Sequence, residues 1–210
     1  MANSATHSTK VFPIFPNWHT RQLILASQSP RRKQLIELLG LPFIIRPVDC
    51  DETWPAELEG PAIPRHVSEL KARACLASMK AEIDPERDVV LTSDTVVQLD
   101  GATLEKPIDN EDARRMLRLL SGRTHKVTTA FTLAHKREIK TYHDTVAVTF
   151  MPLPEALITR YVESGAPLDK AGSYGAQDLI GAVGIEKLEG SFYTVMGLPM
   201  HMVFDKLQRI

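Results

Sequence analysis

The chain has few cysteines, few aromatic residues and no excess charge of either sign. Its 210 residues include two cysteines, and aromatic residues make up 6% with a formal net charge of −1. Cys50 and Cys75 form neither a CxxC pair nor a zinc spacing, so we predict a reduced cytoplasmic protein without a disulfide framework. Binding to the nucleic-acid backbone needs a surplus of lysine and arginine, and we therefore expect no nucleic-acid partner.

The sequence also lacks long apolar runs and several common catalytic motifs. No apolar run approaches the ~18–20 residues that cross a bilayer, and the first residues do not have the pattern of a secretory signal. The motifs GxxxxGKS/T, GxGxxG, HExxH and GxSxG are absent. We expect no membrane partner. We interpret residues 1–20 as a poorly ordered extension in which Phe12, Phe15 and Trp18 pack onto the body.

Strand and helix patterns alternate along the rest of the chain. Apolar or β-branched runs predict strands at 23–26, 43–48, 88–99, 102–105, 126–134, 139–150 and 182–188. Apolar spacing and capping residues predict helices at 30–39, 66–80, 110–120, 154–164 and 199–207. The alternation predicts a single α/β or mixed α+β domain over residues 21–210. Between the elements we expect a loop at 53–64 and a glycine-rich polar loop at 166–178.

The segment from Ser27 to Lys33 is a candidate anion site. Ser29 is a natural N-cap and Pro30 suits the first helical position, so a helix begins here. Its free N–H groups and partial positive charge attract anions. Arginine and lysine in the first turn oppose the helix dipole at roughly 0.3–1 kcal/mol each, a conflict that a bound polyphosphate resolves. The alternative is a capped helix with solvated arginines.

A carboxylate and a lysine are predicted to meet near one hairpin. Asp94 lies inside an apolar β-forming run, where a carboxylate is costly unless it binds metal, pairs with a cation or takes part in chemistry. Lys106 follows the hairpin turn Asp100-Gly101 and returns toward Asp94. A capping role for Asp94 and a surface position for Lys106 are the alternatives.

Two loops complete the candidate site. The run Asp49-Cys50-Asp51-Glu52 gathers carboxylates at a predicted strand end, and Mg²⁺ prefers such oxygen ligands. A solvated acidic loop is the alternative. The glycines of Asp169–Gln177 let the backbone approach a ligand closely, and the polar side chains between them can read a base. A plain mobile loop is the alternative there.

Taken in order, these segments resemble the Maf family of nucleotide pyrophosphatases. The matching pieces are LASQSPRR, DETWP, ELKA, SDTVV, EKP, LSGRTHKVTT, DKAGSYGAQ and EGSFYTVMGLP. The resemblance implies an elongated central mixed sheet flanked by helices, two lobes with a deep cleft, a fold related to the inosine triphosphate pyrophosphatases, and a homodimer. It also implies hydrolysis of a nucleoside triphosphate between the α and β phosphates with Mg²⁺, or with Mn²⁺ or Co²⁺.

The resemblance assigns roles to residues that match the family's motifs. Asp94 is implied to activate water and to bind the metal with Glu52. The implied substrate ligands are Ser27, Ser29, Arg31, Arg32, Lys71, Thr95, Lys106 and Gln177.

Three of these residues match one branch of the family. Arg31, Thr95 and Gln177 resemble the branch that acts on dTTP and UTP, and modified pyrimidine nucleotides are further candidate substrates. Glu105 stands where the family usually has glycine, and its carboxylate would repel phosphate if it pointed inward. The alternative functions are the same chemistry on 7-methyl-GTP or another modified nucleotide, and a nucleotide-binding regulator of cell division with little turnover.

Overall fold

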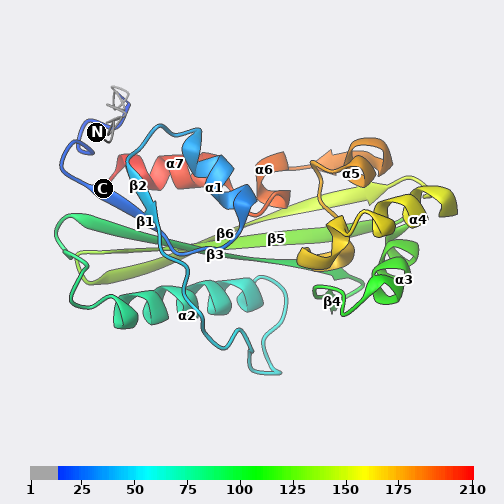
Figure 1. The fold of residues 1–210 in the computed structure, drawn as a ribbon, viewed down its shortest axis with the longest axis horizontal. Coiled ribbons are helices and arrows are strands. Elements are labelled where there is room, and N and C mark those ends of the chain that lie inside the picture. The colour runs from blue at the N-terminus through cyan, green and yellow to red at the C-terminus, as the bar shows by residue number, and fades with distance from the viewer. Residues whose placement is uncertain (1–13) are drawn as a thin grey trace, which may run out of the picture.

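The computed structural model describes residues 14–210, which form one long sheet with helices on both faces (Figure 1). The strands are β1 (Gln22–Leu25), β2 (Phe43–Ile45), β3 (Asp88–Leu99), β4 (Ala102–Leu104), β5 (Thr124–His135), β6 (Glu138–Phe150) and β7 (Ile185–Glu189). The helices are α1 (Pro30–Glu37), α2 (Ala62–Ser78), α3 (Asn110–Leu120), α4 (Glu155–Glu163), α5 (Leu179–Gly184), α6 (Phe192–Val195) and α7 (Met200–Gln208). Two 3₁₀ helices, η1 (Ala166–Asp169) and η2 (Ala171–Ser173), lie between α4 and α5.

The sheet is mixed, as the family resemblance implied. Its strand order is β2-β1-β3-β5-β6-β7, with β4 paired to β3 alone. β1 is parallel to β2 and β3, whereas β3, β5, β6 and β7 pair antiparallel. β3, β5 and β6 are the long strands, and they give the molecule its elongated shape (Figure 1).

Two large cores lie toward opposite ends of the long strands. One core joins α1, α7 and the parallel strands, with Leu23, Leu91 and Val203 fully buried. The other joins α3, α4 and the far ends of β5 and β6, with Leu117 and Ile158 at its centre. Separate cores at the two ends support the predicted arrangement in two lobes. A smaller cluster lies between α2 and the sheet, on the face opposite α1 and α7 (Figure 1).

Helix α2 begins earlier than the sequence pattern predicted. The expected loop at 53–64 ends at Pro61, and the helix starts at Ala62 instead of His66. Pro64 lies in the first helical turn, where the missing N–H group has no intrahelical partner to lose. The proline that we interpreted as a loop residue is therefore compatible with the helix start.

The predicted strand at 182–188 is wrong in its first half. Residues Leu179–Gly184 form α5, and β7 begins only at Ile185. A short apolar run does not distinguish a strand from a buried helix by periodicity. Glycine is required at position 181, because a Cβ atom there would lie 2.3 Å from the carbonyl oxygen of Ala176. The predicted loop at 166–178 also contains η1 and η2, and the short helix α6 was not predicted.

The chain before β1 packs onto the body from residue 14 onward. Phe15 and Trp18 are each 1% exposed, and the Trp18 indole donates a hydrogen bond to the Leu207 carbonyl oxygen at 3.0 Å. Their expected packing is confirmed, whereas Phe12 lies outside the described residues. Within residues 14–210 no helix is long and apolar enough to cross a membrane. Cys50 and Cys75 are both free thiols.

Candidate active site

Asp94 lies where β3 has no partner strand on one side. β1 pairs with β3 as far as Leu91, and β4 pairs with it only from Val97 onward. Asp94 itself pairs with Ala130 of β5 on the other side. Along the described chain, the edge of β3 between β1 and β4 therefore opens to a cleft, and the Asp94 carboxylate remains partly exposed.

The start of α1 forms one wall of this cleft. Ser29 is the N-cap, and its hydroxyl oxygen accepts a hydrogen bond from the Arg32 backbone N–H at 3.4 Å. The Ser27 hydroxyl oxygen accepts from the Ser29 N–H at 3.2 Å. Both hydroxyl protons remain available as donors, so the serines can cap the helix and bind an anion together. Lys33 does not share this wall, since it is exposed and pairs with Glu37 of the same helix at 3.7 Å.

The Arg32 side chain extends across the cleft and donates hydrogen bonds to residues on both sides. Its guanidinium donates to the Gly197 carbonyl oxygen at 2.9 Å, to the Thr95 hydroxyl at 3.3 Å and to the Ser27 hydroxyl at 3.5 Å. Burial lowers the pKa of Arg32, and the nearby Asp94 carboxylate opposes that shift. Arginine stays protonated in proteins at neutral pH, so this partly buried positive charge is available for an anion.

Lys71 joins the two carboxylates predicted to bind metal. Its Nζ lies 2.8 Å from Glu52 Oε2 and 2.9 Å from Asp94 Oδ1. The Lys71 side chain is 11% exposed, whereas that of Glu52 is 51% exposed. The lysine thus extends from the middle of α2, inside the fold, and Glu52 contacts its ammonium from the exposed side.

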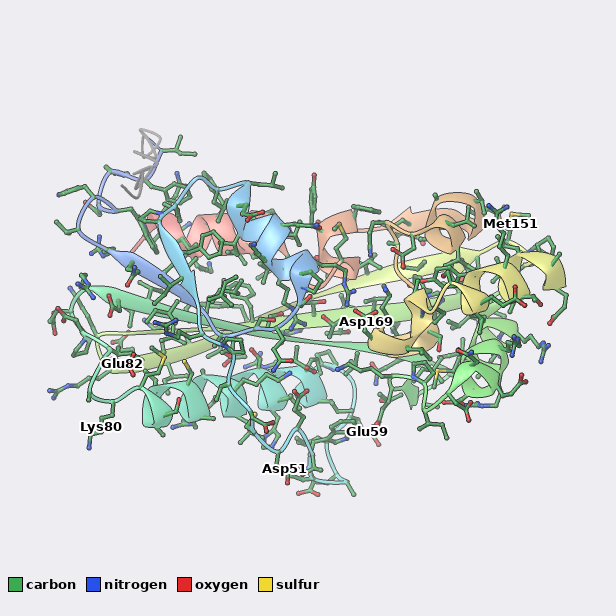
Figure 2. The ribbon with its side chains drawn as sticks, in the orientation of Figure 1. Asp51, Glu59, Lys80, Glu82, Met151 and Asp169 are labelled. Atoms are coloured by element: carbon green, nitrogen blue, oxygen red, sulfur yellow. The ribbon has the colours of Figure 1, made fainter. Side chains whose placement is uncertain are left out.

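Arg31 reaches across the cleft to η1. Its guanidinium donates to Asp169 Oδ2 at 2.8 Å, and Asp169 lies near the middle of the molecule's long axis (Figure 2). Burial opposes ionisation of Asp169, but hydrogen bonds from Lys170 and Arg31 outweigh it and lower the pKa of this carboxyl. Any anion that binds Arg31 would therefore have to compete with Asp169.

One cleft contains all of the predicted site residues. Its volume is about 430 Å³, and residues from both lobes line it. The predicted residues that line it are Ser27, Ser29, Arg31, Arg32, Glu52, Lys71, Asp94, Thr95, Lys106 and Gln177. Lys106 and Gln177 are exposed at its surface, and the Gln177 amide donates to Asp178 at 3.0 Å.

Glu105 does not line the same cleft. It lines an adjoining cavity of about 560 Å³, which shares with the first the residues Glu52, Asp94, Thr95, Lys106 and Ala171. Its backbone carbonyl oxygen accepts from the Gly172 N–H at 3.1 Å, which fixes η2 against the end of β4. The arginines of α1 are not among the residues around the adjoining cavity. Glu105 is exposed and lines this second cavity, not the first.

Sequence reasoning did not single out several residues that shape the cleft. Gly197 supplies the carbonyl oxygen that anchors Arg32, at a φ of 107° that favours glycine. Thr129 shares a hydrogen bond with Thr95 at 2.9 Å. Lys170 is 9% exposed and is held by Asp169 and the Ala166 carbonyl oxygen at 2.7 and 2.5 Å. The motif DKAGSYG includes Lys170, but composition alone does not separate it from solvated lysines.

His125 lies beneath the glycine-rich segment of the cleft. It is 2% exposed, and its Nε2 lies 2.7 Å from the hydroxyl of Tyr174, a cleft residue. Burial lowers the pKa of His125 to about 4. The ring is therefore neutral in the folded protein at neutral pH. It supports the segment that leads to Gln177.

We expect the buried His125 to make the protein sensitive to acid. The His125 imidazole is protonated near pH 6.5 in the unfolded chain but only near pH 4 in the folded chain. Above about pH 6.5 the ring is neutral in both states, and the free energy of unfolding has its full value. It falls as the pH decreases toward 4, by up to about 3 kcal/mol. Urea unfolding at pH 7 and pH 4.5 measures this loss. It should shrink in His125→Gln and persist in His201→Gln, a control on the exposed face of α7. Equal losses in all three proteins would assign the acid sensitivity to other groups.

The oxygen donors of the cleft suit a cation that arrives with a phosphate. Within residues 14–210 no group of three or more His, Cys, Asp or Glu side chains is placed to hold a metal ion. Glu52 and Asp94 supply two carboxylates at one wall of the cleft. Mg²⁺ is commonly bound by one or two carboxylates together with substrate phosphates, so these residues fit that use.

Comparison with known proteins decides the family. The family model described as Maf-like protein matches residues 22–210. The chain belongs to the Maf family. The match covers both lobes and every residue of the cleft, so the Maf architecture includes the whole site.

Curated relatives in the Maf family are similar over nearly the whole chain. A Porphyromonas gingivalis protein is 42% identical over 196 residues, which cover 93% of this chain and 97% of the relative. A Bacteroides thetaiotaomicron protein is 41% identical and a Chlorobaculum tepidum protein 43%, each over 90% of this chain and over 96% and 94% of their own lengths. All three relatives are named dTTP/UTP pyrophosphatase.

A solved structure is similar to a lower degree. The Staphylococcus aureus Ham1 protein aligns with 89% of this chain at 13% identity and a TM-score of 0.46. The mixed α/β class follows from the sheet itself.

Proposed function

We propose that this chain hydrolyses dTTP and UTP to the nucleoside monophosphate and pyrophosphate. The observation that carries the proposal is the meeting of Asp94 with Arg31, Arg32 and Lys106 at one cleft. A carboxylate that handles water, beside cations that bind phosphate, is the combination that phosphoryl hydrolysis needs. The relatives named dTTP/UTP pyrophosphatase support this choice of nucleotides.

The α1 wall and Lys106 are proposed to hold the polyphosphate. The Ser27 and Ser29 hydroxyls and the N–H groups at the helix start donate hydrogen bonds to phosphate oxygens. Arg32 is already fixed by its contacts to Gly197 and Thr95, so little side-chain entropy is lost when phosphate binds. Arg31 becomes available when phosphate displaces Asp169.

Asp94 is proposed to orient the attacking water and to take up its proton. A divalent cation bound by Glu52 and Asp94, Mg²⁺ first and Mn²⁺ or Co²⁺ as alternatives, would polarise the phosphoryl group and lower the pKa of the water. The water oxygen attacks the α-phosphorus, and the bond from that phosphorus to the bridging oxygen breaks. The negative charge that passes to pyrophosphate is stabilised by Arg32 and Lys106.

Base selection is proposed to involve Gln177 and Thr95. Both line the cleft, and the Gln177 amide can exchange its hydrogen bond to Asp178 for one to a pyrimidine edge. A wrong base that covers the Gln177 amide without pairing to it would lose about 1–3 kcal/mol.

Location and oligomeric state are further proposals. The free thiols of Cys50 and Cys75 support the cytoplasmic location predicted from composition. The homodimer implied by the family resemblance stays a prediction.

A nucleotide panel tests the proposed function. Purified protein with Mg²⁺ is incubated with dTTP, UTP, CTP, ATP, GTP and 7-methyl-GTP, and the products are separated by chromatography. Monophosphate and pyrophosphate from dTTP and UTP are expected. Orthophosphate as the product would reject cleavage between the α and β phosphates, and preference for 7-methyl-GTP would reject the pyrimidine assignment. Binding without turnover would favour a nucleotide-binding regulator.

A further inference from the structure

The ammonium group of Lys71 occupies the space between two carboxylates at the centre of the cleft. Its contacts with Glu52 and Asp94 are 2.8 and 2.9 Å, and both use carboxylate oxygens. The Lys71 side chain is 11% exposed and that of Asp94 is 15% exposed. A buried cation between two acidic side chains neutralises part of their charge and fixes their positions.

Because of this arrangement, Glu52 and Asp94 form a poor site for a divalent cation in the protein without nucleotide. A metal that took oxygen ligands from both Glu52 and Asp94 would lie next to the Lys71 ammonium, and like charges at such distances repel strongly in a partly buried site. The described residues offer no further carboxylate or imidazole that completes a group of three donors. The protein by itself therefore lacks the charge and the ligands that hold Mg²⁺.

We propose that Lys71 is a placeholder cation, which keeps Glu52 and Asp94 ready in the free protein and excludes divalent metal until nucleotide arrives. The inference rests on the proposed function, because a triphosphate is the anion that attracts Lys71 away from the carboxylates. Lys71 then turns toward phosphate, and the two carboxylates become available for a cation carried by the nucleotide. Lys71 is thus a positioning residue that couples metal entry to substrate entry.

The proposal assigns Lys71 a different role from that of Lys106. Lys106 lines the same cleft but is exposed, and no ion pair of the described part of the chain involves it. Its removal weakens phosphate binding without changing the charge between Glu52 and Asp94. A comparison of Lys71→Gln with Lys106→Gln therefore distinguishes the loss of a metal-excluding charge from a general loss of positive charge in the cleft.

Binding of Mn²⁺ to the protein without nucleotide, followed by electron paramagnetic resonance, tests the proposal. Lys71→Gln is expected to bind Mn²⁺ at least about tenfold more tightly than the wild type, because the repelling charge is gone. Lys71→Arg, which keeps the charge, and Lys106→Gln should stay within about threefold of the wild type. Mn²⁺ should also raise the melting temperature of Lys71→Gln more than that of the wild type.

Equal Mn²⁺ affinities for wild type and Lys71→Gln overturn the proposal, as does an equal gain in Lys106→Gln. Lys71→Met repeats the measurement if the glutamine variant does not fold. These readouts need no turnover, so they are independent of the nucleotide panel. A tighter Mn²⁺ site in Lys71→Gln, in a protein that hydrolyses no triphosphate, would support the placeholder and reject the proposed substrate.

Discussion

Asp94→Asn is expected to lower kcat for dTTP by about 10²- to 10⁴-fold, the range that a positioned acid or base contributes. Asparagine keeps the size of the side chain but cannot take up the proton of water. The carboxylate also contacts Lys71, so the circular dichroism spectrum and the melting temperature must show that the variant folds. Steady-state release of pyrophosphate measures the loss.

Asp100→Asn is the matched control for Asp94→Asn. Asp100 lies at the turn just after the same strand, it is exposed, and it pairs with Arg123 outside the cleft. Its φ of 51° is tolerated by asparagine, so the substitution leaves the turn intact. Turnover by Asp100→Asn should match the wild type. Full activity in a folded Asp94→Asn variant would show that another group activates the water.

Arg32→Ala is expected to reduce kcat/KM by about 100- to 1,000-fold, the effect of removing a preorganised donor from a developing negative charge. The guanidinium binds the Gly197 carbonyl oxygen and the Thr95 hydroxyl, so it is held in place before substrate arrives. Arg32→Lys keeps a charge but loses the planar fork, and an intermediate loss is expected. Initial rates over a range of dTTP concentrations measure both variants.

Lys33→Ala is the control that separates contact from overall charge. Lys33 follows Arg32 on the same helix, yet its side chain is half exposed and pairs with Glu37. Its removal should leave kcat/KM within about twofold of the wild type, because exposed charges are strongly screened. A comparable loss in Lys33→Ala and Arg32→Ala would mean that helix charge matters more than the buried contact.

The sequence predicted elements best where the deciding signals are local. The start of α1 follows from Ser29 and Pro30, which cap and open the helix by contacts within a few residues. The long strands β3, β5 and β6 follow from their β-branched runs. The prediction was wrong at residues 182–184, where an apolar run predicted as a strand forms the end of α5, because periodicity does not separate a short buried helix from a strand.

The sequence indicated which residues belong to the site, but it did not indicate which of them pair with one another. Arg31 and Asp169 are separated by 138 positions, and nothing in either segment identifies the other as its partner. The family resemblance implied that Lys71 binds phosphate, but nothing in the sequence indicated that its ammonium lies between Glu52 and Asp94. Such contacts depend on how α2 packs on β3, which is a property of the whole fold.

The sequence by itself determined the mixed α/β class, the capped start of α1 and the set of chemical groups, because capping, periodicity and residue type act over short distances. Only the tertiary structure decided where those groups meet. The pairing of β3 with β1 ends at Leu91 and its pairing with β4 starts at Val97, and the opening between β1 and β4 leaves Asp94 partly exposed. That opening is set by long-range strand pairing, which selects the neighbours of each side chain from every part of the chain.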